Sequence, residues 1–458
     1  KIRNIAYLLM IINLFFNKPE TSEVFDKQKI IIYTISFLFS IILHFREFKI
    51  VNWARMDLFF LLGFIVVHFQ WAIMLLFGYQ LEFFTHYNLQ MVHMNFSVWL
   101  SSLAGISWLF GYSSVKRINY TISEFNFFSF DYTKIKYITI LSYILFLITA
   151  GMDFYTGAVY KTGMGARASG EGIAAYFQEF FQISVIVWVS LIILQSSFSK
   201  ETKIKSFYFF KNKLFLVFLI SYIVLFLYIG DRGGIIQIGL ALLIAYGYLI
   251  KPIRARTFFP LLIIGTILMT IIGLGRSSAG IESGYEKLNF ESGAFALTMN
   301  LSNSTRVLHS AIEYSESNDF FYGKLFIGNI LGAIPYAQTI YLNISEAEKH
   351  TLSSSSFFTH LKKGKNASSG EGTTIVADVY INFGITGVII LFYLFGKIFM
   401  KIENQLIIKR NLNYIVIALL LASGTIYMSR ANLLFPLKSF VWGLLILKLV
   451  KKSKKINT

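Results

Sequence analysis

Apolar residues recur along the chain in long runs that few charged residues interrupt. Many windows of 16–22 residues carry no charge, which is the length that a helix needs to cross a hydrocarbon core of about 30 Å. The short alternating segments of a membrane β-barrel are not seen in the sequence. The pattern therefore predicts an all-α, polytopic integral membrane protein. The twelve predicted spans lie near residues 4–16, 30–45, 57–77, 91–112, 137–151, 176–194, 214–229, 234–250, 258–275, 374–396, 412–429 and 431–449.

The connections between these spans alternate in charge. Every second connection is rich in Lys and Arg, and so is the C-terminal "KLVKKSKK". Positive residues mark the cytoplasmic side of a membrane protein, so both termini are predicted to be cytoplasmic. The basic connections lie near residues 46–55, 116–136, 200–213, 251–256 and 397–410.

This topology places one very long segment, residues 276–373, on the outer side. We expect a single membrane domain, residues 1–458, with this segment as its large external loop. The loop contains helical patterns and an apolar patch, "LFIGNILGAIPYAQTIYL", which we interpret as re-entrant or interfacial rather than as a span. A loop of this length in a compact membrane domain is typically functional.

Composition narrows the class further. The chain of 458 residues is 55% hydrophobic and carries no cysteine, which excludes disulfides and thiolate metal sites. The net charge of +18 is explained by the cytoplasmic loops, so no nucleic-acid partner is expected. No metal-ligand spacing, Walker motif or nucleophile elbow is found, and we predict neither a metal nor a cofactor.

The arginines form the most informative chemical pattern. Of twelve, seven lie on the predicted cytoplasmic side, where topology explains them, and five lie on the side that normally avoids cations. The guanidinium group of arginine is planar and permanently charged, and its N–H donors bind phosphate oxygens well. A single arginine at a helix end, however, often only extends to the phosphates of neighbouring lipids. The five predicted outward residues are Arg167, Arg232, Arg276, Arg306 and Arg430.

The motif "GDRGG" joins two apolar spans through a very tight turn. Arg232 sits in this turn, and Gly233 and Gly234 open the next helix. The first N–H groups of a helix are unpaired and favour anions. The turn is therefore predicted to bind an anion at the outer membrane surface, while Asp231 could simply neutralise Arg232.

Three side chains are candidates for a general base, in the order His309, Glu371 and Asp378. His309 follows Arg306 by three residues, so both would share one face of a helix. Glu371 and Asp378 flank the start of a predicted span. The simpler interpretations are a solvated helix face for the histidine and dipole partners at a helix start for the acids.

In layout and in two short motifs, the chain resembles the Wzy-type O-antigen and oligosaccharide repeat-unit polymerases. The shared features are many spans, one large external loop, external arginines, "GDRGG" between two spans, and "TTIVADVYINFGITGVIILFYLFG" after the loop. The Arg-x10-Gly loop motifs of some members are not matched, because Gln178 stands eleven positions after Arg167 and Lys287 eleven after Arg276.

The resemblance implies a metal-independent membrane glycosyltransferase in a bacterial cytoplasmic membrane, with a GT-C-like polymerase/ligase architecture and an outward-facing active site. The growing glycan would pass from undecaprenyl diphosphate to a sugar hydroxyl of an incoming lipid-linked repeat unit, in the biosynthesis of lipopolysaccharide, exopolysaccharide or capsule. Membrane lipids and a chain-length regulator protein are the other implied partners. Positive charge is required where the diphosphate departs. Arg232 and Arg276 would stabilise the negative charge that builds on the departing diphosphate, and Arg167, Arg306, Arg430, Gly233 and Gly234 would bind the substrate.

Two other functions fit parts of the pattern. A glycan ligase of the O-antigen ligase type would use similar arginines and a loop histidine with a different acceptor. A flippase for lipid-linked oligosaccharides would instead need cations deep in a central cavity. The spans are almost free of charge, which favours the enzyme over the transporter.

Overall fold

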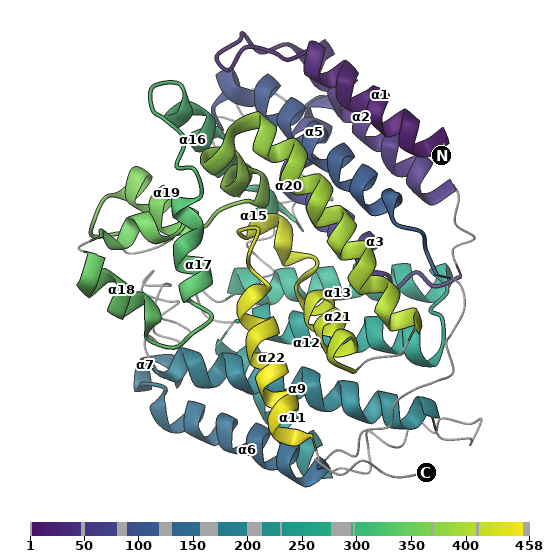
Figure 1. Ribbon diagram of the computed structural model, residues 1–458, viewed down its shortest axis with the longest axis vertical. Coiled ribbons are helices and arrows are strands. Elements are labelled where there is room, and N and C mark those ends of the chain that lie inside the picture. Colours follow the sequence, from purple (N-terminus) through teal and green to yellow (C-terminus); the bar gives the residue numbers. More distant parts are fainter. Residues whose placement is uncertain are drawn as a thin grey trace.

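The computed structural model describes most of the chain, with gaps that fall mainly in connections. The described residues form helices joined by turns and contain no β-strand, apart from an isolated bridge at Lys451. Figure 1 shows the helices in one bundle, with the segment from α16 to α19 on one side of it. The described ranges are 2–46, 51–79, 89–118, 131–155, 173–198, 213–229, 231–275, 295, 298–345, 347–367, 370–408 and 412–451.

The long apolar helices agree with the sequence pattern, since each of the twelve predicted spans coincides with a helix. Within the described ranges, five helices are long and apolar enough to cross a membrane, and four shorter apolar helices accompany them. That all twelve cross remains a prediction. The bundle helices are α1 (Ile2–Phe16), α2 (Lys27–Arg46), α3 (Met56–Leu76), α5 (Met94–Ser114), α6 (Tyr132–Thr149), α9 (Ile173–Phe198), α11 (Lys213–Ile229), α12 (Gly233–Ala245) with η3 (Tyr246–Ile250), α13 (Ala255–Gly275), α20 (Ile375–Ile408), α21 (Leu412–Gly424) and α22 (Leu437–Val450).

Short helices make up the rest. The patch at 325–342 is broken into small pieces, which agrees with its exclusion from the predicted spans. The last hairpin differs from the prediction, because α21 ends at Gly424 and α22 begins only at Leu437. The short elements are η1 (Met91–His93), α7 (Met152–Tyr155), α15 (Met299–Ser302), α16 (Thr305–Ser315), η5 (Lys324–Phe326), α17 (Ile327–Leu331), α18 (Ala337–Ser345), η6 (Lys349–Leu352), α19 (Ser354–Lys363) and η7 (Tyr427–Arg430).

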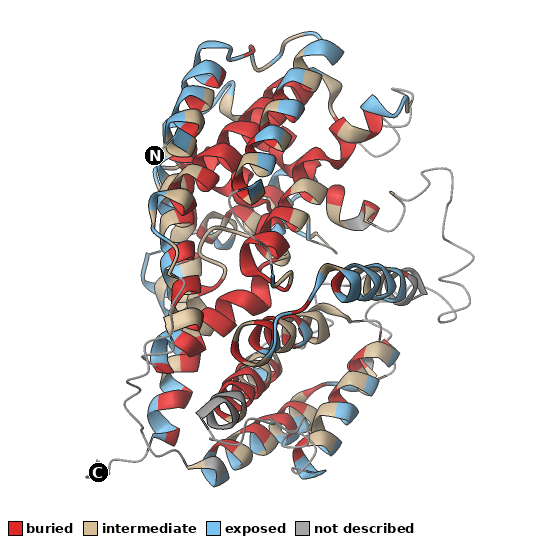
Figure 2. Cartoon of the chain, turned by 90° about the vertical axis from the view of Figure 1, so that its right-hand side faces the viewer, coloured by how far each residue is buried: buried red, intermediate tan, exposed pale blue. Residues whose placement is uncertain are grey.

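Helices α5 and α20 form the centre of the bundle and pack backbone against backbone. A Cβ atom on Gly111 would lie 1.8 Å from the carbonyl oxygen of Tyr393, and one on Gly396 would lie 2.1 Å from that of Trp108. Small residues permit such close packing between helices in membranes. Figure 2 shows buried residues concentrated in the middle of the bundle. This central pair is the scaffold for the described part of residues 276–373, which we call the large segment.

The outer faces of peripheral helices are apolar. On α13, for example, Leu261, Ile263, Ile264 and Leu268 are exposed. Large contiguous apolar surfaces are rare on proteins that contact only water. The surface of the bundle is therefore suited to lipid.

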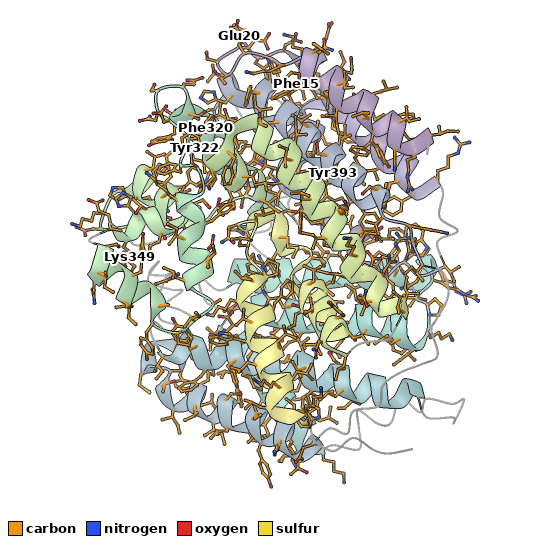
Figure 3. The ribbon with its side chains drawn as sticks, in the orientation of Figure 1. Phe15, Glu20, Phe320, Tyr322, Lys349 and Tyr393 are labelled. Carbon is orange, nitrogen blue, oxygen red and sulfur yellow. The ribbon has the colours of Figure 1, made fainter. Side chains whose placement is uncertain are left out.

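Helix α20 is interrupted where the sequence reads "INFG". Gly384 has φ of 63° inside the helix, a conformation that residues with a Cβ rarely adopt. The freed carbonyl groups of Ile381 and Asn382 accept hydrogen bonds from the N–H groups of Phe321 (3.1 Å) and Tyr322 (2.8 Å). Phe320 packs beside the break, near Tyr322 in Figure 3. The break thus joins the large segment to the central helix.

At the opposite end, where the basic connections lie, two buried acids hold the helices together. Asp57 accepts from Nε of Arg55 at 2.8 Å and lies 2.9 Å from Nε2 of His44. Glu403 accepts from the hydroxyls of Tyr112, at 2.8 Å, and Tyr248. We call these residues, with Arg117 at 3.8 Å from Glu403, the inner network. It joins α2, α3, α5, η3 and α20.

Candidate functional site

The large segment forms a polar pocket around Arg306. One terminal nitrogen of Arg306 lies 2.7 Å from Oε2 of Glu371, and Nζ of Lys363 lies 2.8 Å from Oε1 of the same carboxylate. The cavity has a volume of about 410 Å³. We call it the Arg306 pocket. Its lining residues are Leu89, Gln90, Arg306, Ser310, Lys362, Lys363 and Glu371.

Two amphipathic helices position these charges. Helix α16 buries Val307, Leu308, Ala311 and Ile312, which leaves the Arg306 side chain, 33% exposed, at the pocket. Helix α19 ends in "HLKKG" and carries both pocket lysines. The hydroxyl of Thr359 on α19 accepts from the N–H of Glu371 at 2.9 Å. Two cations, Arg306 and Lys363, therefore flank the Glu371 carboxylate in an open cavity that Lys362 also lines.

His309 points away from this pocket, into the protein. Its Nδ1 accepts from the N–H of Gln90 at 3.1 Å, and its Nε2 lies 3.1 Å from the hydroxyl of Ser97. The Ser97 hydroxyl donates in turn to the carbonyl of Met94, so Nε2–H donates to Ser97. Burial lowers the pKa of His309 to about 3, and the nearby His93 and Lys362 add to this. The ring is neutral, with both nitrogens engaged.

Asp378 is also completely buried. One carboxylate oxygen accepts from the hydroxyl of Ser354 at the start of α19, and the other accepts from the N–H of Leu433 at 2.8 Å. Leu433 belongs to the connection between α21 and α22. Asp378 therefore ties the large segment and this connection to the central helix.

Two of the predicted arginines lie at turns whose helices, α12 and α21, pack together, and Tyr427 lies at the second turn. Arg232 immediately precedes α12, and Arg430 ends η7. Arg232, Asp231 and Arg430 all lie within electrostatic range of the Tyr427 side chain. We call these four residues the arginine cluster. It is built by the close packing of α12 against α21.

The two glycines of "GDRGG" have separate structural roles. The N–H of Gly233 donates to the carboxylate of Asp231 at 3.0 Å, so this helix-start donor already has an anionic partner. A Cβ on Gly234 would lie 2.2 Å from the amide nitrogen of Gln182 and from the hydroxyl of Tyr222. Gly234 therefore permits the close approach of α9 and α11 to α12.

Helix α3 connects the Arg306 pocket and the arginine cluster. The hydroxyl of Thr305, next to Arg306, donates to the carbonyl of Val67. One helical turn earlier, Gly63 lies against the backbone of Ile426, next to Tyr427; a Cβ there would be 2.4 Å from the Ile426 carbonyl oxygen. The two groups of cations thus lie beside neighbouring turns of one helix.

Two of the predicted arginines belong to neither group. Arg167 and Arg276 lie outside the described residues. Among the residues that the structure describes, no group of three or more His, Asp or Glu side chains could hold a metal ion.

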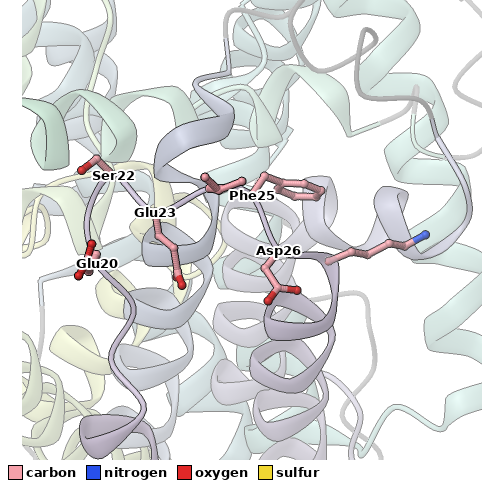
Figure 4. Close-up of a pocket in the computed structure, with 7 residues that line it drawn as sticks. Glu20, Ser22, Glu23, Phe25 and Asp26 are labelled. Atoms are coloured by element: carbon pink, nitrogen blue, oxygen red, sulfur yellow. The ribbon is translucent and has the colours of Figure 1, made fainter.

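A larger cavity of about 610 Å³ lies in the connection between α1 and α2. Figure 4 shows the carboxylates of Glu20, Glu23 and Asp26 at this cavity. Negative side chains repel phosphate groups, so this cavity does not suit a diphosphate.

The sequence pattern did not identify Lys362, Lys363 or Tyr427. The only signal for the lysines is the basic pair in "HLKKG", within a segment of nearly balanced charge. No local sequence pattern marks Tyr427, because it lies within electrostatic range of two arginines that belong to separate turns.

Comparison with known families gives one match, to the family described as O-antigen polysaccharide polymerase Wzy, over residues 2–455. No curated protein and no solved structure matches the chain. The family match covers nearly the whole sequence and agrees with the apolar helices of the bundle. The chain is therefore a membrane protein of polysaccharide biosynthesis, and it belongs to the O-antigen polysaccharide polymerase Wzy family.

Proposed function

We propose that this protein polymerises lipid-linked oligosaccharide repeat units at the outer face of the bacterial cytoplasmic membrane. The growing glycan passes from undecaprenyl diphosphate to a sugar hydroxyl of the incoming lipid-linked unit, within a GT-C-like bundle of twelve spans whose termini are cytoplasmic. A chain-length regulator protein is a partner in this proposal. The single observation that carries it is the packing of α12 against α21, with Arg232 immediately before α12 and Arg430 at the end of η7, which follows α21.

The depth of the arginine cluster supports a role with lipid-linked substrates. Helix α21 has 13 residues and α22 has 14, so each is about 20 Å long. Both are shorter than the hydrocarbon core of about 30 Å. If their basic ends lie at the inner surface, the turn that carries Arg430 lies below the outer surface. Arginine at such a depth is costly and marks functional sites.

The departing diphosphate accounts for the arginines. When the glycosidic bond to the lipid diphosphate breaks, negative charge builds on the leaving oxygen. Arg232 and Arg430 would stabilise that charge, and their effect is greatest where water is excluded. Arg167 and Arg276 remain candidates for the same role, as predicted from the sequence.

Glu371 is the best placed of the three candidate bases. His309 has both ring nitrogens engaged and Asp378 both carboxylate oxygens, so we assign these two residues to positioning. Glu371 lines the open pocket between Arg306 and Lys363. A substrate phosphate that competes for these cations would release the carboxylate to accept the hydroxyl proton.

Reconstitution tests the reaction. The purified protein in nanodiscs, supplied with undecaprenyl-diphosphate-linked repeat units, should form a ladder of polymers without nucleotide sugar and in the presence of a chelator. A requirement for nucleotide sugar or divalent metal would contradict the proposal. Transfer to a lipid A–core acceptor, with no ladder in its absence, would favour the ligase.

Cysteine labelling tests the topology, because the chain has no cysteine of its own. Lys349, labelled in Figure 3, lies on the large segment, and Arg256 lies at the basic end of the bundle. In intact cells an impermeant maleimide should label Lys349→Cys and spare Arg256→Cys. The reverse pattern would place the large segment in the cytoplasm.

A further inference from the structure

The segment from Leu325 to Ser345 combines two properties that conflict in water. Its 21 residues include no charged side chain, yet α18 buries none of its residues within the protein. The exposed fractions are 53% for Ile330, 61% for Ile334, 57% for Ile340 and 78% for Ile344. We call α17, α18 and the turn between them the α17–α18 hairpin, and these four isoleucines its apolar face.

Exposure of this face to water would be unfavourable. Fully burying one isoleucine side chain stabilises a protein by roughly 1.5–3 kcal/mol, and the face presents four. On α18 the exposed polar residues Thr339 and Asn343 form a separate stripe beside Ile340 and Ile344, since successive residues are 100° apart around a helix. The hairpin is therefore amphipathic, as is typical of elements that lie in a membrane interface.

The hairpin packs beside an apolar helix of the bundle. The indole N–H of Trp442 in α22 donates to the carbonyl of Ala333 at 2.8 Å. Val441 precedes Trp442 and begins an exposed stripe on α22 that continues through Leu445 and Leu449. Ile334, which is also exposed, follows Ala333 directly, so the apolar face of the hairpin begins beside α22. Figure 1 shows α17 near the upper end of α22.

Backbone groups at the turn of the hairpin have internal partners. The carbonyl of Gly328 accepts from the N–H of Gly332 at 2.8 Å and from the side-chain amide of Gln338 at 2.5 Å. Tyr336, after Pro335, has φ of 62°, which lets the chain turn back. Irregular backbone at membrane depth is tolerated only when its polar groups are satisfied in this way.

We propose that the α17–α18 hairpin is immersed in the bilayer leaflet on the side of the large segment, with its apolar face against lipid acyl chains. Asn329 of the hairpin accepts from the side-chain amide of Asn432 at 3.0 Å, two residues after Arg430. Immersion of the hairpin thus fixes the height of the arginine cluster relative to the lipid phosphates. This placement is independent of the reaction that the protein catalyses.

Spin-label accessibility tests the proposal. Single nitroxide labels would be attached to Ile340→Cys and Ile344→Cys, and to the matched polar stripe at Thr339→Cys and Asn343→Cys. The protein would be held in nanodiscs of phosphatidylethanolamine and phosphatidylglycerol. Leu445→Cys on α22 serves as the lipid reference, and Lys349→Cys serves as the aqueous reference.

The labels at Ile340 and Ile344 should collide with oxygen several-fold more than with the water-soluble nickel complex, relative to the labels at Thr339 and Asn343. Their values should approach that of Leu445→Cys. Preferential collision with the nickel complex at Ile340 and Ile344 would show a water-exposed face and overturn the proposal. Low accessibility to both reagents would also overturn it, because the face would then be covered by a second copy or another protein.

Discussion

The two ends of the bundle use the same residue types in opposite ways. In the inner network Arg55, Asp57 and His44 are at most 3% exposed and pair with one another. In the Arg306 pocket, Arg306 and Lys363 are each 33% exposed and line an open cavity with Glu371. Charges that are closed off from solvent hold helices together, whereas charges at a cavity can exchange partners with a substrate. The comparison distinguishes charges that stabilise the bundle from charges that we propose to act on a substrate.

The largest expected effect lies at the inner network. Asp57→Asn would leave Arg55 buried without its ionic partner, and breaking a buried ion pair from one side typically costs about 3–5 kcal/mol. We expect this loss in the free energy of unfolding, measured in mixed micelles. The polymerisation rate per folded molecule should be unchanged.

Lys29→Gln is the control for this variant. It removes an ion pair with Glu23 in which the lysine is 39% exposed, and exposed ion pairs contribute little to the free energy of unfolding. Equal destabilisation by the two variants would show that the inner network does not stabilise the bundle more than a surface pair does.

At the Arg306 pocket the expected effect is on rate. Glu371→Gln removes the proposed base, and loss of general-base catalysis lowers a rate by about 10²-fold or more. Initial rates with a defined lipid-linked repeat unit measure this loss. Glu313→Gln is the matched control, because Glu313 pairs with Lys362 beside the pocket but is 49% exposed. A wild-type rate for Glu371→Gln would place the base elsewhere.

A smaller effect concerns pH and His309. The pKa of His309 is lowered by burial from 6.5 to about 3, so below pH 6.5 the unfolded chain takes up a proton that the folded protein excludes. The free energy of unfolding should therefore fall as pH drops from 6.5 toward 3, by about 1.4 kcal/mol per pH unit. In His309→Gln this contribution is absent, so the fall between pH 6.5 and 5 should be about 2 kcal/mol smaller.

Unfolding at the two pH values, for both proteins, measures this difference. Equal slopes would show that His309 is not held neutral in the folded protein. If His309 only positions its neighbours, His309→Gln should keep most of the polymerisation rate at pH 7.5. A loss as large as that of Glu371→Gln would instead restore His309 as the candidate base.

The positions of the helices could be predicted from the sequence, because a helix that crosses lipid needs a run of about 20 predominantly apolar residues. The end of α21 and the start of α22 could not be predicted in this way. The apolar residues between Gly424 and Leu437 continue the hydropathy of both helices, but there the chain forms η7 and a connection that donates to Asp378. The break in α20 could not be predicted either, because its hydrogen-bond partners, Phe321 and Tyr322, lie sixty residues earlier in the chain.

The residues of the candidate site could be predicted only in part, for a similar reason. The charge pattern identified Arg232, Arg306 and Arg430 without their partners, because the pattern depends only on the side of the membrane. The helical spacing of Arg306 and His309 predicted a common face, yet Arg306 lines a cavity and His309 is buried against Gln90 and Ser97. Those two residues lie more than 200 positions earlier in the chain, so no local pattern could show the contact.

The central claim is that the arginine cluster stabilises a departing diphosphate, and the variant Arg232→Ala, Arg430→Ala tests it most directly. Loss of one such stabiliser typically lowers a rate by about 10²–10³-fold. Lysine at the same positions should restore only part of the rate, because an ammonium group cannot form the bidentate hydrogen bonds of a guanidinium group. Arg256→Ala, an exposed arginine at the basic end, is the control for lost charge, and unfolding in micelles verifies that each variant is folded. With chelator present and no nucleotide, we expect wild type and Arg256→Ala to form full-length polymer and the folded double variant to form none. Full-length polymer from the double variant would contradict the account.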